Sequence, residues 1–124
     1  MIDFQNSKAF KLSVVDNNVW ADKLAPMMIA GETIVQSFKA LRDGVVFTNK
    51  RIFVINIQGM TGKKVDFTSL PYTKIQAYSV ETAGTFDIDS ELELWFSGLG
   101  KVKLEFVTRA DVGQICRFIS EKVL

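Results

Sequence analysis

The stretch of residues 44–59 restricts the fold of this chain more than any other. It contains two apolar runs, residues 45–47 and 52–57, which are separated by the polar residues 48–51. β-Branched and aromatic residues dominate both runs, and such residues favour strands. Asn49 tolerates the positive φ that tight hairpin turns require. The stretch therefore predicts a buried β-hairpin.

Chain length and cysteine content predict a single cytoplasmic domain. A chain of 124 residues buries about two-thirds of its unfolded surface and folds without disulfides or metals. Cys116 is the only cysteine, so no internal disulfide can form. The N-terminus has no signal-like apolar segment, and no apolar run reaches the roughly 18 residues that a spanning helix needs. We therefore expect a cytoplasmic protein that does not cross a membrane.

The balance of charge and apolar residues favours protein partners over nucleic acid. Fifteen Lys and Arg against fourteen Asp and Glu leave a net charge of +1, which provides no overall field to attract nucleic acid. Hydrophobic residues make up 48% of the chain, including ten Phe, and charged residues only 23%. Such a composition leaves apolar surface for another protein to cover. Self-association is the simplest way to cover it.

The chain contains no histidine, and this absence restricts its chemistry. It excludes histidine as a general acid or base, the Ser-His and Cys-His nucleophile pairs, and imidazole metal sites. An enzyme would have to rely on carboxylates, Lys, Tyr or the single Cys116. We therefore expect a non-enzymatic protein without a cofactor or metal.

Short strands and polar turns alternate along most of the chain. An apolar helical face from Val19 to Met28 follows Asn18, a suitable N-cap, and ends before Gly31. Strands are expected at 32–41, 45–47, 52–57, 63–70, 73–82, 86–96 and 101–106. Residues 1–15 have no clear period and fit a frayed helix or a docked tail equally well. The pattern predicts an N-terminal extension with a short helix, residues 1–30, and a mainly β domain of the α+β class, residues 31–124.

The strand predicted at 86–96 has the most regular alternation. Its inner face consists of Phe86, Ile88, Leu92, Leu94 and Phe96. Its outer face consists of Asp87, Asp89, Glu91, Glu93 and Trp95. An outward aromatic residue is typical of interfaces, so Trp95 and the acidic row are candidates for a subunit contact. The row does not fit a calcium loop, because Leu92 stands where such a loop needs glycine.

The next predicted strand, 101–106, alternates in the same way. Keeping both apolar sets on one face predicts a loop at residues 98–100 and pairs Phe96 with Val102. The pairing continues with Leu94 opposite Leu104 and Leu92 opposite Phe106. On the outer face this register places Lys103 opposite Trp95, within reach of a cation–π contact. Lys103 therefore joins the candidate subunit contact.

The C-terminal segment predicts an amphipathic helix. Thr108 and Asp111 have the spacing of a capping box, so the helix is expected to begin there. Its apolar stripe consists of Val112, Ile115, Cys116, Ile119 and Val123. The position of Cys116 within this stripe indicates a small core residue rather than a nucleophile. The helix is expected to cover one face of the sheet.

Ten short segments carry a family likeness: Ala25-Pro26, Gly31-Glu32, Arg42-Asp43, 47–51, Gln58-Gly59, 61–64, Pro71-Tyr72, 79–84, 86–89 and Ser97-Gly98. Through these segments the chain resembles the bacterial pleckstrin-homology-like family of short single-domain proteins. The resemblance implies a barrel of two orthogonal antiparallel sheets, here with seven strands, capped by the C-terminal helix. It also implies no enzymatic activity and assembly into cyclic, ring-like homo-oligomers.

Four basic residues form a candidate anion or lipid site. The first and third turns of an antiparallel meander lie at the same end, so Lys39 and Arg42 are expected near Lys63 and Lys64. Asp43 lies among them, and charged turn residues are commonly just solvated. In the eukaryotic lipid-binding domains that the chain resembles distantly, the loop here is long and basic, whereas this chain has only residues 42–44.

Two hypotheses follow from these features. The first is a scaffold that forms a cyclic homo-oligomer and presents a surface to an unidentified protein partner, with Trp95, the acidic row and Lys103 at the subunit contact. The alternative is a peripheral module that binds a membrane or an anionic ligand through the four basic residues. Neither hypothesis involves nucleic acid.

Overall fold

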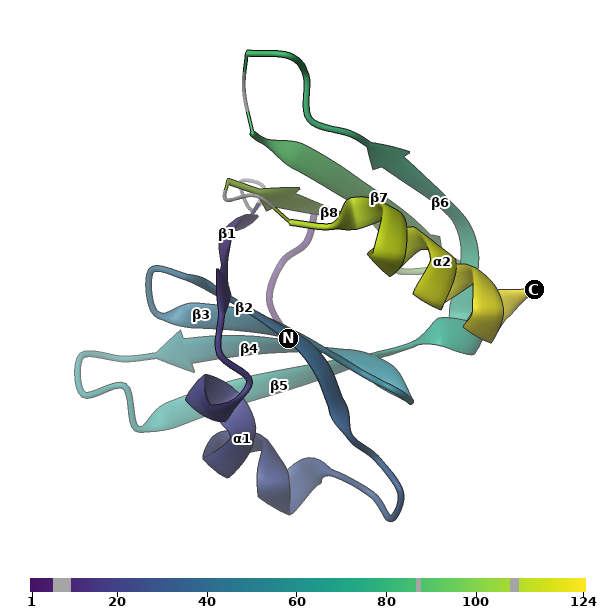
Figure 1. Cartoon of the computed structure of the whole chain (residues 1–124). Helices are drawn as coiled ribbons and strands as arrows, with labels where there is room; N and C mark the ends of the chain where they lie inside the picture. Colours follow the sequence, from purple (N-terminus) through teal and green to yellow (C-terminus); the bar gives the residue numbers. More distant parts are fainter. Residues whose placement is uncertain (6–9, 87, 108–109) are drawn as a thin grey trace.

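The computed structural model describes residues 1–5, 10–86, 88–107 and 110–124 (Figure 1). Its strands are β1 (Phe10–Val15), β2 (Ile34–Ala40), β3 (Asp43–Thr48), β4 (Arg51–Gln58), β5 (Lys64–Pro71), β6 (Ile75–Glu81), β7 (Ser90–Phe96) and β8 (Gly100–Phe106). Its helices are α1 (Asn18–Leu24) and α2 (Val112–Val123), with the 3₁₀ turns η1 (Ala25–Met27) and η2 (Tyr72–Lys74).

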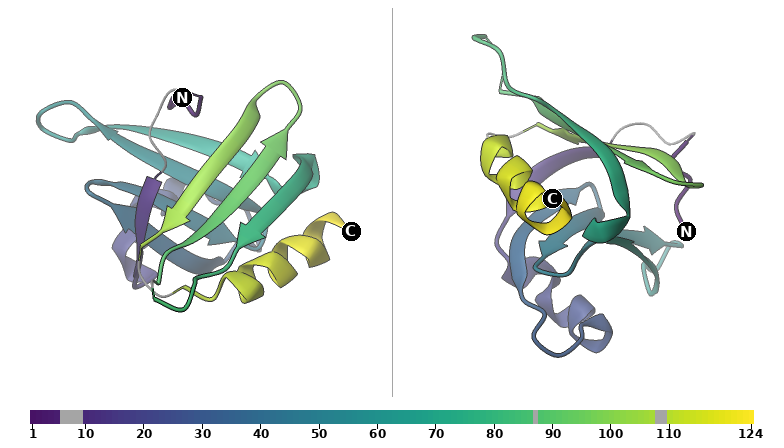
Figure 2. Two further views of the ribbon diagram at one scale, coloured as in Figure 1. Left: turned by 90° about the horizontal axis from the view of Figure 1, so that it is seen from above. Right: turned by 90° about the vertical axis from the view of Figure 1, so that its right-hand side faces the viewer.

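Neighbouring strands are hydrogen-bonded in the order β5-β4-β3-β2-β1-β8-β7-β6. β1 pairs antiparallel with β2 and parallel with β8, so it joins a sheet of β2 to β5 to a sheet of β6 to β8. Figures 1 and 2 show the two sheets facing each other, with α2 at the open side between them. This mainly β architecture with a C-terminal helix confirms the predicted fold class.

The described residues form eight strands, whereas the sequence predicted seven. The additional strand is β1. Residues 10–15 form a paired strand between the two sheets rather than a frayed helix. Among the described side chains of β1, only Leu12 is fully buried, whereas Val14 is 51% exposed. One buried position produces no detectable period. The proposed division of the chain at residue 30 stays a prediction.

The hairpin of β3 and β4 is buried on both faces. Val45, Phe47, Ile52 and Val54 enter the main core between the two sheets. Val46, Phe53 and Ile55 enter a second cluster, which contains Trp20 and Leu24 of α1. Because α1 covers the face that would otherwise meet water, both strands have continuous apolar runs instead of alternating ones. The predicted buried hairpin is confirmed.

α1 is fitted closely to this hairpin. The indole Nε1 of Trp20 donates a hydrogen bond to the carbonyl of Phe38 at 3.0 Å. A Cβ atom at Gly44 would lie 2.3 Å from Cε2 of Trp20, so only glycine permits this approach. The N-cap is Asn17 rather than the predicted Asn18, because the carboxylate of Asp16 accepts a hydrogen bond from the Asn18 backbone at 2.8 Å.

Side chains hold the turn between β3 and β4. The predicted positive φ at Asn49 is wrong, because Leu41, at 44°, has the only positive φ among the described residues other than glycine. Instead, Oγ1 of Thr48 accepts hydrogen bonds from the backbone of Lys50 at 3.1 Å and of Arg51 at 3.0 Å. The side chain of Asn49 accepts one from the Thr33 backbone at 2.8 Å. These side-chain hydrogen bonds hold the turn without a positive φ at Asn49.

β7 begins at Ser90 rather than at the predicted Phe86. Phe86 is 101% exposed and Ile88 is 45% exposed, so the prediction that both face inward is wrong. Leu92, Leu94 and Phe96 are buried as predicted. The pairing of β7 with β6 ends at Glu91, opposite the last residue of β6. Phe86 and Ile88 therefore lie in the loop between these two strands. Asp87 lies outside the described residues.

The predicted register of β7 and β8 is wrong by two residues. Leu94 pairs with Val102, and Phe96 pairs with Gly100. The connecting turn consists of residues 97–99, with a φ of 80° at Gly98 and 92° at Gly100. A shift of two residues leaves every side chain on its original face, so hydrophobic patterning cannot detect it. The geometry of the turn decides the register instead.

α2 covers the main core as its stripe predicts. Val112, Ile115 and Ile119 are buried, whereas Cys116 and Val123 are half-buried at the edge of the stripe. Asp111 is the N-cap, and its side chain accepts a hydrogen bond from the Gln114 backbone at 3.0 Å. The predicted start at Thr108 lies outside the described residues. No described helix is long and apolar enough to span a bilayer.

Candidate functional site

Two turns at one end of the molecule carry the predicted basic residues. One connects β2 to β3 and the other connects β4 to β5, and both lie at the same end of the sheet (Figure 1). Nη1 of Arg42 donates a hydrogen bond to the carbonyl of Gly59 at 2.7 Å, which joins the two turns directly. Lys39, Lys63 and Lys64 are all exposed. The fold thus brings these cations to one end of the molecule, and their function as a binding site stays a prediction.

The same two turns also carry exposed apolar side chains, which the sequence prediction missed. Leu41 is 100% exposed and Met60 is 104% exposed. Asp43, the acid among the cations, directs its carboxylate inward and accepts hydrogen bonds from the Ile57 backbone at 2.9 Å and the Asn56 side chain at 3.3 Å. The end of the molecule therefore presents two apolar tips flanked by cations.

The outer face of β7 and β8 is crossed by ion pairs. Glu93 pairs with Lys101 at 3.2 Å, and Glu91 pairs with Lys103 at 3.3 Å. The hydrogen bond to Glu91 raises the pKa of Lys103. Asp89 is exposed in the loop before β7, so the predicted acidic row is split between this loop and the strand. The described residues contain no cluster of three or more metal-ligating side chains.

Trp95 lies half-buried on this outer face. It stands opposite Lys101 on β8 and Ala77 on β6. The predicted cation–π contact with Lys103 is wrong, because the register places Lys103 opposite Glu93 and its ammonium group on Glu91. The role of Trp95 in a subunit contact stays a prediction.

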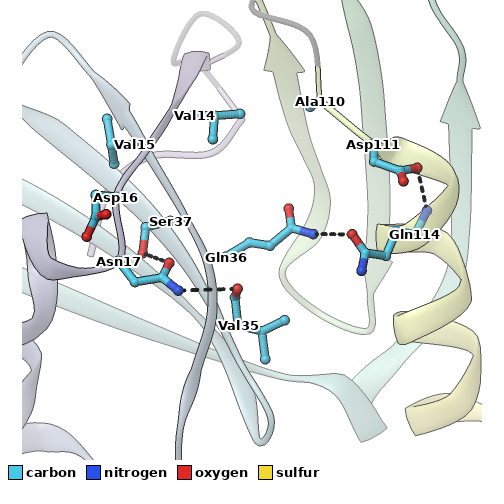
Figure 3. Close-up of a pocket in the computed structure, with 10 residues that line it drawn as sticks. All are labelled: Val14, Val15, Asp16, Asn17, Val35, Gln36, Ser37, Ala110, Asp111 and Gln114. Carbon is cyan, nitrogen blue, oxygen red and sulfur yellow. Dashed lines mark hydrogen bonds between the residues drawn. The ribbon is translucent and has the colours of Figure 1, made fainter.

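A groove of about 450 Å³ lies between the end of β1, the start of β2 and the N-terminus of α2. Figure 3 shows that its polar side chains bond to one another across the groove. Gln36 donates to Gln114 at 3.2 Å, and Ser37 donates to Asn17 at 2.9 Å. Asp16 and Asp111 give the groove an acidic character, and its described lining residues include neither Lys nor Arg.

A second cavity of about 440 Å³ lies at the corner where the chain passes from β5 to β6. Its apolar lining is Leu70, Pro71, Ile75, Phe96 and Leu99. Among the described lining residues Lys74 is the only charged one, beside Ser, Thr and Gln side chains. We call this feature the corner cavity. No motif in the sequence indicated it, because its lining comes from two separate stretches of the chain, 69–76 and 96–99.

Glu32 and Arg51 form a buried ion pair behind the β3–β4 turn. Nη2 of Arg51 lies 2.8 Å from Oε1 of Glu32, and Nε donates to Oε2 at 3.0 Å. The hydroxyl of Thr48 and the backbone of Ile29 also donate to this carboxylate. Burial acts to raise the pKa of Glu32, but these hydrogen bonds outweigh it and lower the pKa to about 2.

Tyr72 lies beside this ion pair. Its hydroxyl donates a hydrogen bond to the Thr48 carbonyl at 2.7 Å. Burial, and then the charge of Glu32, raises the pKa of Tyr72. Glu32 and Tyr72, whose pKa values are strongly shifted, both bond to internal partners. This indicates a structural rather than a catalytic role for these two side chains.

Comparison with known proteins identifies relatives of this chain. Residues 3–123 match the family model described as bacterial PH domain. The uncharacterised protein YjqA of Bacillus subtilis strain 168 is 51% identical over 77 residues, which cover 62% of each chain. The uncharacterised protein YozO of the same strain is 33% identical over 101 residues, covering 82% of this chain and 87% of YozO.

Solved structures agree with this assignment. A DUF1696 family protein with a pleckstrin-homology domain from Shewanella loihica superposes with a TM-score of 0.76 at 40% identity, covering 94% of this chain and all of that one. A pleckstrin homology domain from Shewanella amazonensis has a TM-score of 0.63 at 41% identity, with 95% and 94% covered. A PH-domain protein from Exiguobacterium sibiricum, at 22% identity and a TM-score of 0.61, shares the fold.

Proposed function

The chain belongs to the bacterial PH domain family, and from this premise we propose that it is a non-enzymatic binding module that assembles into a cyclic homo-oligomer. PH domains are generally non-catalytic. The assembled ring would present a surface to a protein partner, as the composition of the chain suggests. Side chains on the outer face of β7 and β8, including Trp95, would help to set the contact between copies.

The observation that supports this proposal most strongly is the pair of open strand edges. β5 and β6 stand at the two ends of the strand order, so within the described chain each has a neighbouring strand on one side only. Open edges carry unpaired N–H and C=O groups, which a second chain can satisfy. The two edges differ in sequence, so a contact between them would be head-to-tail, and head-to-tail contacts generate rings when the rotation closes.

The test is the solution mass, measured by light scattering from low to high salt. We expect a stable multimer whose mass does not change with salt, because backbone pairing and apolar contacts are weakly screened. A Ser79→Lys substitution on the open edge of β6 should lower the mass, since lysine blocks edge pairing. Asn18→Lys, the same kind of change on exposed α1, should not. A monomer at micromolar concentration contradicts the proposal.

A second candidate function is the peripheral binding of an anionic membrane. The observation in its favour is the pair of fully exposed tips, Leu41 and Met60, among Lys39, Arg42, Lys63 and Lys64. Apolar tips can enter the interfacial region while neighbouring cations meet anionic headgroups, each adding about 1 kcal/mol. The Arg42 hydrogen bond to Gly59 would hold the two tips together.

Sedimentation with vesicles of phosphatidylserine and phosphatidylcholine tests this candidate. We expect binding at low salt that falls at least about tenfold in Lys63→Glu/Lys64→Glu, because four units of charge change at the surface. Lys23→Glu/Lys50→Glu is the matched control, since it makes the same charge change away from these turns. Equal loss in both variants, or no binding at low salt, contradicts a role for this end of the molecule.

A further inference from the structure

The loop between β6 and β7 carries the most exposed aromatic side chain in the described chain. The described part of this loop, residues 82–86 and 88–89, projects away from the body of the molecule (Figures 1 and 2). Phe86 on this loop is 101% exposed, and Ile88 is 45% exposed. Two large apolar side chains on a projecting loop are costly to leave in water and typically mark a contact with another molecule. We call these described residues, 82–86 and 88–89, the arm.

The corner cavity offers matching chemistry. Its volume of about 440 Å³ lies in the range of pockets that accept ligands. Leu70, Ile75, Phe96 and Leu99 provide apolar walls, and Lys74 provides the only charge among the described lining residues. The arm has the opposite charge, because Asp89 within it and Glu81 directly before it are acidic, and no Lys or Arg occurs from residue 81 to residue 100. An apolar, acidic arm therefore complements an apolar, basic cavity.

Charge also decides between the corner cavity and the groove beside α2. The groove has nearly the same volume, about 450 Å³, but its described lining contains Asp16 and Asp111 and neither Lys nor Arg. Its polar side chains are already bonded to one another (Figure 3). An acidic arm would be repelled there. The corner cavity is the better match.

The arm cannot fill the corner cavity of its own chain. The arm enters β7 at Ser90, whereas the cavity is lined by Phe96 at the other end of the same strand. Six residue steps along a strand separate these ends by about 20 Å. Moreover, the arm projects away from the body at its own end (Figure 2). Only a second molecule can bring an arm to this cavity.

We propose that the arm of one copy docks into the corner cavity of the next copy, with Phe86 among the apolar walls and Asp89 near Lys74. The inference rests on the proposed self-assembly and identifies one of its contacts. Every copy then carries one donor arm and one acceptor cavity at opposite ends of β7. Such a contact is head-to-tail and propagates from copy to copy until the ring closes.

A mixing experiment with two variants tests the contact. Phe86→Ser removes the donor side chain and leaves the cavity intact, whereas Lys74→Glu reverses the charge of the cavity and leaves the arm intact. Both residues are exposed, so the far-UV circular dichroism spectrum of each variant should match that of the parent chain. Met60→Ser, which removes an equally exposed apolar residue from a different loop, serves as the control.

We expect each variant alone to associate at least about tenfold more weakly than the parent, and the control to keep the parent mass. An equimolar mixture should form a 1:1 dimer, because it restores one intact arm and one intact cavity. Association as tight as that of the parent in both variants, or a mixture that associates no more tightly than either variant alone, overturns the arm contact while self-assembly stands. A monomeric parent chain overturns self-assembly itself.

Discussion

At the scale of single residues, the Glu32–Arg51 ion pair stabilises the fold. The side chain of Glu32 is fully buried, and four donors satisfy its carboxylate. Arg51 also donates to the Met27 carbonyl at 2.7 Å, and its guanidinium lies 4.2 Å from the centre of the Phe53 ring. The pair therefore connects the segment before β2 to the β3–β4 hairpin. Its interactions are all internal, which separates it from the basic end of the molecule.

This arrangement predicts a loss of stability in acid. The pKa of Glu32 is about 2 in the folded chain against an ordinary value of 4.5, so the stabilisation is complete above about pH 4.5 and is lost as the pH falls toward 2. Glu32→Gln should lower the free energy of unfolding by about 3 kcal/mol at pH 7, since it leaves Arg51 without its charge partner. At pH 3 that deficit should shrink by about 2 kcal/mol.

Urea unfolding at both pH values measures the effect. Glu121→Gln, an exposed change on α2, is the control and should alter the free energy of unfolding by less than about 0.5 kcal/mol. A Glu32→Gln deficit of the same size at pH 7 and pH 3 would show that the pKa of Glu32 is not lowered.

At the scale of elements, α1 packs closely against the β3 strand. Trp20 lies over Gly44, and its indole hydrogen bond to Phe38 prevents the ring from moving aside. α1 in turn buries Val46, Phe53 and Ile55, which would otherwise form an exposed apolar face. The packing of one short helix therefore depends on the absence of a side chain at one strand position.

Gly44→Ala should consequently destabilise the chain by about 1–3 kcal/mol, the usual cost of an overpacked core. The added Cβ atom would lie 2.3 Å from the indole ring, so α1 must shift. Thermal and urea unfolding measure the change. In a double-mutant cycle, Trp20→Phe should recover part of the loss, because it removes the overlapping atoms. Strict additivity of the two substitutions would contradict this account.

At the scale of the whole molecule, β1 connects the two sheets. It is the only described strand that pairs with both of them, at Ser37 to Lys39 on β2 and at Leu104 to Phe106 on β8. β5 and β6 then stand at the two ends of the strand order, each with one neighbouring strand in the described chain. The N-terminal strand thus joins the two sheets on one side of the molecule, and the edges of β5 and β6 stay open.

Leu12→Ala should therefore cost about 2–5 kcal/mol, the usual range for a buried leucine in a core. Leu12 is 0% exposed and belongs to the main core. Val14→Ala on the same strand is the control, because Val14 is 51% exposed and should change stability by less than about 1 kcal/mol. Urea unfolding separates the two cases. Equal effects would mean that β1 contributes pairing but little packing.

A sequence pattern predicts a structural feature correctly only when that feature depends on residues that are close together in the chain. The α2 stripe and the inward faces of β7 and β8 were correct, because burial imposes periods that are visible locally. The register of β7 and β8 was wrong, since a shift of two residues preserves that period. Phe86 and Ile88 were assigned to the core because their spacing matches the strand, although no neighbouring strand reaches them.

The candidate site was likewise predicted only in part. The sequence predicted that Arg42 and Lys63 share one end of the molecule, because turns of a meander alternate between its ends. It did not predict the apolar tips, Leu41 and Met60, or the corner cavity, since exposure and concavity depend on which segments pack together.

By itself, the amino-acid sequence determined the class of the fold, the buried hairpin, the amphipathic C-terminal helix and the exclusion of histidine chemistry. These follow from side-chain chemistry and from periods of a few residues. The tertiary structure alone decided the role of β1, the strand register, the internal pairing of Glu32 with Arg51, and the separation of the arm from the corner cavity. Each of these depends on contacts between residues distant in the chain, which local patterns do not record.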